Sequence, residues 1–213
     1  NTAIPTISAI RSIGAIPKLA DVSDDYLMDI SKIKRLITKK TKAIIPVHLY
    51  GQTCNMNEIK KISKKHKIKI IEDCAQSQGS KYQKKFCGTF GDIGCFSFYP
   101  TKILGAYGDG GLILTNNFDL YKKIKRIRFY GIETVDNKNK FKNKYYANEN
   151  GVNSRLDEIQ AALLNFKLKK VDKFIKRRRS IAKFYLKEFK NSSLTLPNEK
   201  KNFKHVYHLF TLY

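Results

Sequence analysis

The stretch Ile68-Lys69-Ile70-Ile71-Glu72-Asp73-Cys74-Ala75-Gln76 joins a short apolar run to an acidic end. A β-branched run such as residues 68–71 is typical of a buried strand in a parallel sheet. Glu72 and Asp73 then fall at the carboxyl end of this strand, the edge where open α/β sheets bind their ligands. Side chains alternate along a strand, so these two carboxylates are expected on opposite faces. The stretch predicts a sheet with a polar site at one edge.

A second strand is predicted directly ahead of a lysine. Residues 93–99 are mainly apolar and end at Pro100, which cannot donate a ladder hydrogen bond. Thr101 and Lys102 follow, and then a segment with four glycines at positions 105, 108, 110 and 111. An exposed lysine in a glycine-rich turn is the simpler interpretation, since lysine is abundant throughout the chain. The position after a buried strand is also a plausible place for a partly desolvated amine that can act as a nucleophile, so both interpretations stay open at this point.

Strands and helices alternate on both sides of this region. One helix is predicted to end near His66, and either Asn55 or Asn57 could cap its start. The expected helices span residues 6–13, 30–37, 56–66 and 118–129, and the expected strands span residues 16–22, 42–49, 68–71, 93–99 and 111–115. This order predicts an α/β fold with a mainly parallel mixed sheet and helices on both faces.

The second half of the chain is expected to contain a polar loop and a long helix. Residues 133–150 are rich in Lys and Asn, which predicts a mobile loop. Ser154 followed by Asp157 matches a capping box, so a helix is predicted to begin there, bend before Phe174 and end near residue 189. Residues 1–190 would form one domain. Residues 191–213, a linker and then a strand from His205, would open a smaller second domain, and both ends of the sequence look truncated.

Composition leaves several classes of protein open. A net charge of +24 invites a nucleic-acid-binding interpretation, but the lysines are scattered and no DNA- or RNA-binding motif is present. The one compact basic cluster, residues 176–179, falls in a helical pattern, where it is expected to be a solvated face. The sequence shows neither a membrane-spanning apolar run nor a signal peptide. The four cysteines show no metal-ligand spacing, which indicates reduced thiols, a cytoplasmic protein and no metal site.

Several blocks of the sequence together resemble the DegT/DnrJ-type nucleotide-sugar aminotransferases. These are pyridoxal 5'-phosphate enzymes of the aspartate-aminotransferase fold. The blocks are Glu72-Asp73-x-Ala75-Gln76, Gly91-Asp92, residues 96–105, Gly108-Asp109-Gly110-Gly111, residues 46–51, residues 153–158 and Gln160-Ala161-Ala162. The resemblance implies a truncated large domain of such an enzyme, followed by the start of its small C-terminal domain.

The resemblance also implies a role for each candidate site residue. Lys102 would hold the cofactor covalently and move a proton, and Asp73 would keep the ring nitrogen protonated. Gln76 would lie beside the phenolic oxygen. Ser97 would bind the phosphate together with Asn153 from the partner subunit of a homodimer. Asn153 directly precedes the predicted helix start, where an anion is favoured.

The implied reaction moves an amino group, with glutamate as the expected donor, to a nucleotide-linked keto sugar for surface polysaccharide synthesis. Residues 128–131 and 145–153 look closest to enzymes that make 3-amino sugars. Ala3 stands where many members carry an aromatic residue that stacks on the cofactor, Ile103 stands where asparagine is common, and the family's glycine-threonine phosphate loop would precede Asn1.

Three alternatives to this reaction stay open. One is a related pyridoxal-phosphate sugar dehydratase, although members of that subgroup have histidine at the position of Lys102. Another is a basic nucleic-acid-binding protein, and a third is a fragment that is inactive alone. For His48, a hydrogen-bonded place in the core is as plausible as a role in the site.

Overall fold

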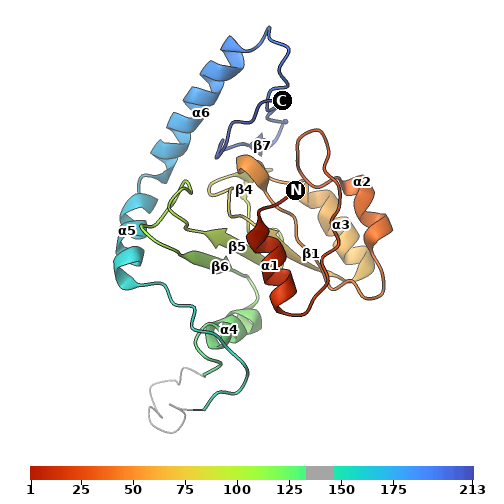
Figure 1. Cartoon of the computed structure of the whole chain (residues 1–213), viewed down its shortest axis with the longest axis vertical. Helices are drawn as coiled ribbons and strands as arrows, with labels where there is room; N and C mark the ends of the chain where they lie inside the picture. Colours follow the sequence, from red (N-terminus) through yellow and green to blue (C-terminus); the bar gives the residue numbers. More distant parts are fainter. Residues whose placement is uncertain (133–145) are drawn as a thin grey trace.

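The computed structural model describes residues 1–132 and 146–213, and a four-stranded mixed sheet lies at its centre (Figure 1). The strands are β1 (Ala43–Ile44), β2 (Lys69–Asp73), β5 (Ile93–Ser97) and β6 (Gly111–Leu114), in the order β1-β2-β5-β6. The pairs β1–β2 and β2–β5 are parallel, and β6 runs antiparallel to β5. The predicted mainly parallel mixed sheet is confirmed.

The first predicted strand of this sheet is shorter than residues 42–49. Beyond Ile44 the chain still runs beside β2, since Asp73 donates its N–H to Pro46 and His48 donates to Asp73. Pro46 has no N–H group, so the regular ladder is interrupted there.

Helices cover both faces of the sheet. Ile70 and Glu72 share one face, which α3 (Met56–His66) covers by packing Ile59 and its neighbours against Ile70. Of the two caps predicted for α3, Asn55 and Asn57, the structure uses Asn55, whose side chain accepts the N–H of Glu58. On the opposite face, α1 (Ile4–Ser12) lies in front of the sheet in Figure 1 and contacts Asp73.

The other elements frame this centre. The predicted helices at residues 30–37 and 118–129 are confirmed, the first as a short α-turn that continues as a 3-10 helix. A small second sheet has the order β4-β3-β7. The bounds are α2 (Ile30–Ile33), η1 (Lys34–Leu36), η2 (Leu49–Gly51), β3 (Lys81–Tyr82), β4 (Lys85–Phe86), α4 (Phe118–Ile127) and β7 (Phe203–Lys204).

The strand predicted at residues 16–22 is wrong. Only Val22 makes a β-contact there, an isolated bridge to Met28. Ile16 and Leu19 are 74% and 69% exposed, so their apolar side chains lack the packed surface that a strand needs.

The long helix predicted from Ser154 begins later than expected. It is divided into α5 (Glu158–Leu168) and α6 (Val171–Glu188), with the break falling before Phe174 as predicted. The capping-box prediction is wrong, because Ser154 donates its N–H to Arg128 and Asp157 is the residue before the helix. Of the predicted mobile loop, residues 133–145 lie outside the described residues.

The strand predicted from His205 is not formed. Residues 205–208 instead pack against the segment around Gly51. Val206 donates its N–H to Gly51, and residues 205–208 are buried. Arg178 and Arg179 of α6 donate to carbonyl oxygens of this segment, so the basic cluster is not simply a solvated face. The domain boundary at residue 190 stays a prediction.

Candidate active site

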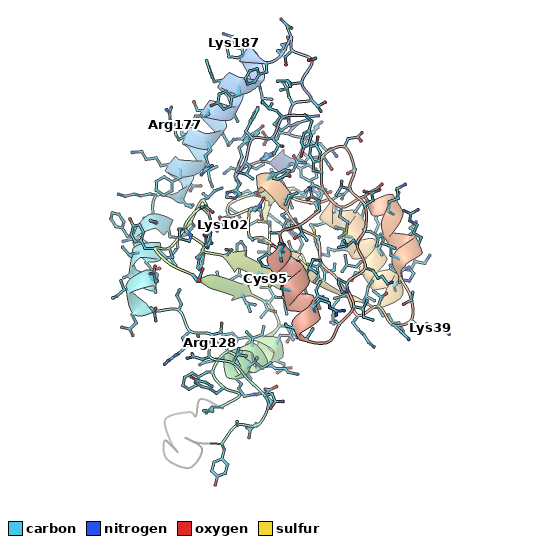
Figure 2. All side chains as sticks on the ribbon, viewed as in Figure 1. Lys39, Cys95, Lys102, Arg128, Arg177 and Lys187 are labelled. Carbon is cyan, nitrogen blue, oxygen red and sulfur yellow. The ribbon has the colours of Figure 1, made fainter. Side chains whose placement is uncertain are left out.

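Four of the five predicted site residues gather at the carboxyl end of β2 and β5. Asp73 ends β2, Gln76 lies in the turn that follows, Ser97 ends β5, and Lys102 comes five residues later. The register pairs Asp73 with Cys95, so Asp73 and Ser97 lie on the same face of the sheet. Figure 2 shows Lys102 just beyond the end of β5.

Two hydrogen bonds orient the carboxylate of Asp73. The hydroxyl of Thr6 donates to Oδ2 over 2.7 Å, and the N–H of Ala75 donates to Oδ1 over 3.1 Å. Both oxygens therefore act as acceptors, which suits an ionised carboxylate with lone pairs left for a cationic ligand. Sequence reasoning missed Thr6, since no local pattern joins it to a residue 67 positions away.

Lys102 is held half-buried on a tight turn. Its burial lowers the pKa of the amine from its ordinary value, and the nearby negative charge of Asp73 partly opposes this effect. The turn closes through hydrogen bonds from Lys102 N–H to Tyr99 and from Ala106 N–H to Phe98. A Cβ at Gly105 would lie 2.4 Å from the carbonyl oxygen of Pro100, so the turn needs glycine there.

A groove of about 520 Å³ separates this turn from α6. Its lining includes Lys102, Lys167 and Arg177. Lys167 uses its amine to donate to the carbonyl of Gly105 over 2.7 Å. His208 is buried nearby, and burial, together with the charges of Lys102 and Arg178, lowers its pKa to about 4. Sequence reasoning gave His208 no role.

Ser97 and Gln76 each present a polar group beside the pair Asp73 and Lys102. Ser97 Oγ accepts the N–H of Tyr99 over 3.2 Å, so its hydroxyl proton can be donated to an anion. The amide of Gln78 donates to the carbonyl of Ser97 over 2.6 Å and so fixes its backbone. Gln76 accepts the N–H of Tyr50 through Oε1, which leaves its NH₂ group for another acceptor.

The contacts of Asn153 are with a different part of the chain, residues 129 and 155. It forms a β-bridge with Phe129 after α4 and accepts a hydrogen bond from Arg155 over 3.1 Å. The next helix begins at Glu158, so the expectation that Asn153 sits at a helix N-terminus is wrong. Its side chain is exposed, which keeps it accessible to a second molecule.

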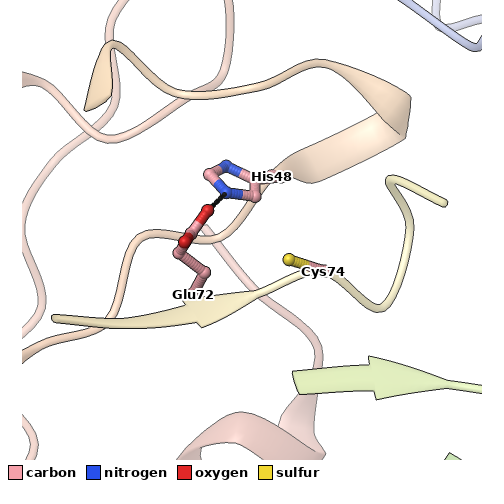
Figure 3. Close-up of side chains that lie close together, drawn as sticks. All are labelled: His48, Glu72 and Cys74. Carbon is pink, nitrogen blue, oxygen red and sulfur yellow. Dashed lines mark hydrogen bonds and ion pairs between the residues drawn. The ribbon is translucent and has the colours of Figure 1, made fainter. Parts of the chain in front are cut away.

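The opposite face of β2 holds a closed structural unit, drawn in Figure 3. Glu72 and His48 are fully buried and are joined by a hydrogen bond of 2.9 Å between Oε2 and Nε2. Cys54 donates its N–H to His48 Nδ1, and Glu72 also accepts three backbone N–H groups. Burial alone would raise the pKa of Glu72, but these hydrogen bonds lower it below the ordinary value. His48 is thus a hydrogen-bonded core residue.

This unit resembles a metal site only in its composition. Ligand atoms of His48, Glu72 and Cys74 lie within 4.8 Å of one another. However, both ring nitrogens of His48 are engaged, and each Glu72 oxygen accepts two hydrogen bonds. A metal would have to displace these bonds, so we assign the unit a structural role.

The donor set at the sheet edge fits pyridoxal phosphate. An anionic carboxylate suits a protonated pyridine nitrogen, a half-buried amine suits an aldehyde, and the hydroxyl of Ser97 suits a phosphate. Two departures noted in the sequence have a structural account. Ala3 is the exposed N-cap of α1 and offers only a methyl group. Ile103 is buried against Ile175 and Val206, so apolar packing replaces an amide there.

Known proteins resemble this chain over its whole length. The sequence model of the DegT/DnrJ/EryC1/StrS aminotransferase family matches residues 1–213. The chain is 42% identical, over 100% of its length and 56% of the relative, to dTDP-3-amino-3,4,6-trideoxy-alpha-D-glucose transaminase from Micromonospora megalomicea subsp. nigra. It is 46% identical, with the same coverage, to dTDP-3-amino-3,6-dideoxy-alpha-D-galactopyranose transaminase from Aneurinibacillus thermoaerophilus.

A solved structure supports the same fold. GDP-4-keto-6-deoxy-D-mannose-3-dehydratase from Escherichia coli, with bound hydrated PLP, superposes with a TM-score of 0.90 at 28% identity. The match covers 100% of this chain and 57% of that protein. The chain spans about half the length of the relatives it matches.

Proposed function

Since the chain belongs to the DegT/DnrJ/EryC1/StrS aminotransferase family, we propose that the protein transfers an amino group from glutamate to a keto sugar linked to a nucleotide. Pyridoxal 5'-phosphate is the cofactor of this family. The observation that carries the proposal is the placement of the half-buried Lys102 amine near the oriented Asp73 carboxylate. Both lie at the edge where parallel sheets bind ligands.

Each residue would have a distinct task. Bound at this edge, pyridoxal phosphate supplies an electron sink that stabilises negative charge on a substrate carbon. Asp73 would hold a proton on the ring nitrogen through its charge, and Ser97 would donate to the phosphate. Lys102 Nζ would hold the cofactor and remove a proton from the α-carbon of the amino donor. A desolvated amine suits this work, because its lowered pKa leaves more of it unprotonated.

The substrate is proposed from the relatives. The two transaminases compared above are both named for dTDP-linked 3-amino sugars, so we propose a nucleotide-linked 3-keto sugar and a place in surface polysaccharide synthesis. Lys102 favours amino transfer over dehydration, because an amine can serve both as anchor and as base. Arg178 and Arg179 bind the chain's own carbonyls, which argues against a free basic face for nucleic acid.

The proposal includes a homodimer with shared sites and a location in the cytoplasm. Asn153 is exposed, as expected of a residue that reaches the partner's phosphate site. Within residues 1–132 and 146–213, every helix is too short or too polar to cross a bilayer.

Covalent labelling tests the assignment of Lys102. The full-length protein is loaded with pyridoxal phosphate, reduced with borohydride and digested, and the modified peptide is identified by mass spectrometry. The label is expected on Lys102 alone. Lys167 lines the same groove and provides an internal control, so a label on Lys167 would contradict the proposal. Stoichiometric conversion of glutamate, with nitrogen found in the sugar product, would distinguish amino transfer from dehydration.

A further inference from the structure

Two threonines connect the start of the chain to the proposed ring-nitrogen partner. Thr2 Oγ1 and Thr6 Oγ1 lie 2.7 Å apart, and Thr6 Oγ1 lies 2.7 Å from Asp73 Oδ2. Both threonines are half-buried. The three side chains therefore form a continuous hydrogen-bonded relay from α1 to the end of β2.

The direction of the relay follows from counting protons. An ionised carboxylate can only accept, and a hydroxyl has one proton to donate. Thr6 must give that proton to Asp73, so the bond between the two threonines is donated by Thr2. Each bond then polarises the next in the same direction, which strengthens the contact to the carboxylate.

The relay leaves Asp73 with a fixed orientation and free acceptor capacity. Thr6 occupies one position on Oδ2, and Ala75 occupies one on Oδ1. Each carboxylate oxygen can accept a further bond. We propose that Thr6 is a positioning residue that aims Asp73 at the ring nitrogen of the cofactor, with Thr2 polarising its hydroxyl. This inference rests on the proposed function.

A purely structural role for Thr6, as a tether that docks α1, is the alternative. The helix contains no buried residue, and its N-cap Ala3 makes no side-chain capping bond, so such a tether would matter. The two roles differ in what they change. A tether affects helix docking and cofactor retention, whereas a positioning residue changes the reactivity of cofactor that is still bound.

The test compares four variants of the full-length protein: Thr6→Val, Thr6→Ser, Thr2→Val and Ser12→Ala. Valine keeps the shape of threonine and removes its hydroxyl, whereas serine keeps the hydroxyl. Ser12 is the control, since its hydroxyl donates to Ala9 within α1 on the exposed side. The readouts are the dissociation constant for pyridoxal phosphate, the pH midpoint of the visible band of the bound cofactor, and the rate of amino transfer from glutamate at saturation.

We expect Thr6→Val to bind the cofactor and to react roughly 10–100-fold more slowly, the scale of one hydrogen bond to a charged group. Its pH midpoint should shift, because the protonated ring nitrogen loses support. Thr6→Ser should restore both values, Thr2→Val should have a smaller effect than Thr6→Val, and Ser12→Ala should match the wild type. In an Asp73→Asn background, Thr6→Val should change the rate little, because its partner charge is already absent.

Other results would overturn the inference. An unchanged rate and pH midpoint in Thr6→Val would show that the contact is not used. Loss of cofactor together with loss of hydrogen-exchange protection in α1, or full additivity with Asp73→Asn, would assign Thr6 to helix docking. Failure of the proposed function has a different signature: the wild-type protein itself would bind no pyridoxal phosphate. A wild type that binds the cofactor, with an unaffected Thr6→Val variant, would overturn the inference on Thr6 alone.

Discussion

Replacing Glu72 by glutamine should strongly destabilise the fold, although the two side chains have nearly the same shape. Glu72 is fully buried and accepts four hydrogen bonds. Oε1 accepts the N–H groups of Phe90 and Gly91, both over 2.7 Å. Oε2 accepts from Gly88 over 2.7 Å and from His48 over 2.9 Å. In glutamine one of these oxygens is replaced by an NH₂ group, which is itself a donor. The two N–H groups that pointed at that oxygen then have no acceptor.

The size of the effect follows from those two lost bonds. Hydrogen bonds to charged groups contribute about 1.5–3 kcal/mol each, so the loss amounts to about 3–6 kcal/mol. That is a large part of the roughly 5–15 kcal/mol by which proteins are stable. Urea denaturation followed by far-ultraviolet circular dichroism measures the free energy of unfolding. Glu58→Gln is the matched control, because the exposed pair of Glu58 and Lys61 should contribute little.

The same residue predicts how stability depends on pH. The folded-state pKa of Glu72 is below its ordinary value of 4.5. The stabilisation that ionised Glu72 adds to the free energy of unfolding is therefore complete above pH 4.5. It is lost as the pH falls through the lower, folded-state pKa. In Glu72→Gln this part of the acid dependence should be absent. A loss below about 1 kcal/mol at neutral pH, or an unchanged acid profile, would refute the hydrogen-bond accounting.

Three further predictions concern the proposed active site. Asp73→Asn should still bind pyridoxal phosphate but transfer amino groups at least roughly a hundredfold more slowly, as measured by single-turnover reaction with glutamate; activity near the wild-type level would show that Asp73 is not the ring partner. Gly105→Ala should displace the turn that carries Lys102, because its Cβ would meet the Pro100 carbonyl at 2.4 Å, and reduced cofactor uptake would show this. Co-expressed Lys102→Ala and Asn153→Ala chains should recover part of the activity that each lacks alone; no recovery in confirmed mixed dimers would place Asn153 in its own subunit's site.

Local patterns explain which parts of the fold were predictable. The helix of residues 56–66 has an apolar face and an asparagine cap, and both signals lie within the helix itself. The strands that end at Asp73 and Ser97 are apolar runs closed by polar residues. Because parallel strands bring their carboxyl ends together, the neighbourhood of Asp73, Ser97 and Lys102 follows from the order of elements alone.

Long-range contacts account for the errors. Ser154 and Asp157 match a capping pattern in sequence. In the structure Ser154 donates its N–H to the carbonyl oxygen of Arg128, and this long-range bond keeps the residue outside the helix. The contact of Thr6 with Asp73 links residues far apart in sequence, and no spacing rule reports it. Arg178 and Arg179 looked like part of a surface charge run, yet their partners are carbonyls near the end of the chain.

The adjacent carboxylates of Glu72 and Asp73 show how one strand separates structure from chemistry. Side-chain alternation sends Glu72 toward the α3 face, where four donors saturate it, and sends Asp73 toward the α1 face, where it keeps acceptor capacity. Glu72 also binds the backbone of residues 88–91, which lead directly into β5. The strand β5 ends at Ser97, and the chain then continues to Lys102. By holding the segment before β5, the carboxylate of Glu72 fixes the strand that carries the other half of the site. The buried acid thus supports the geometry on which the reactive acid depends.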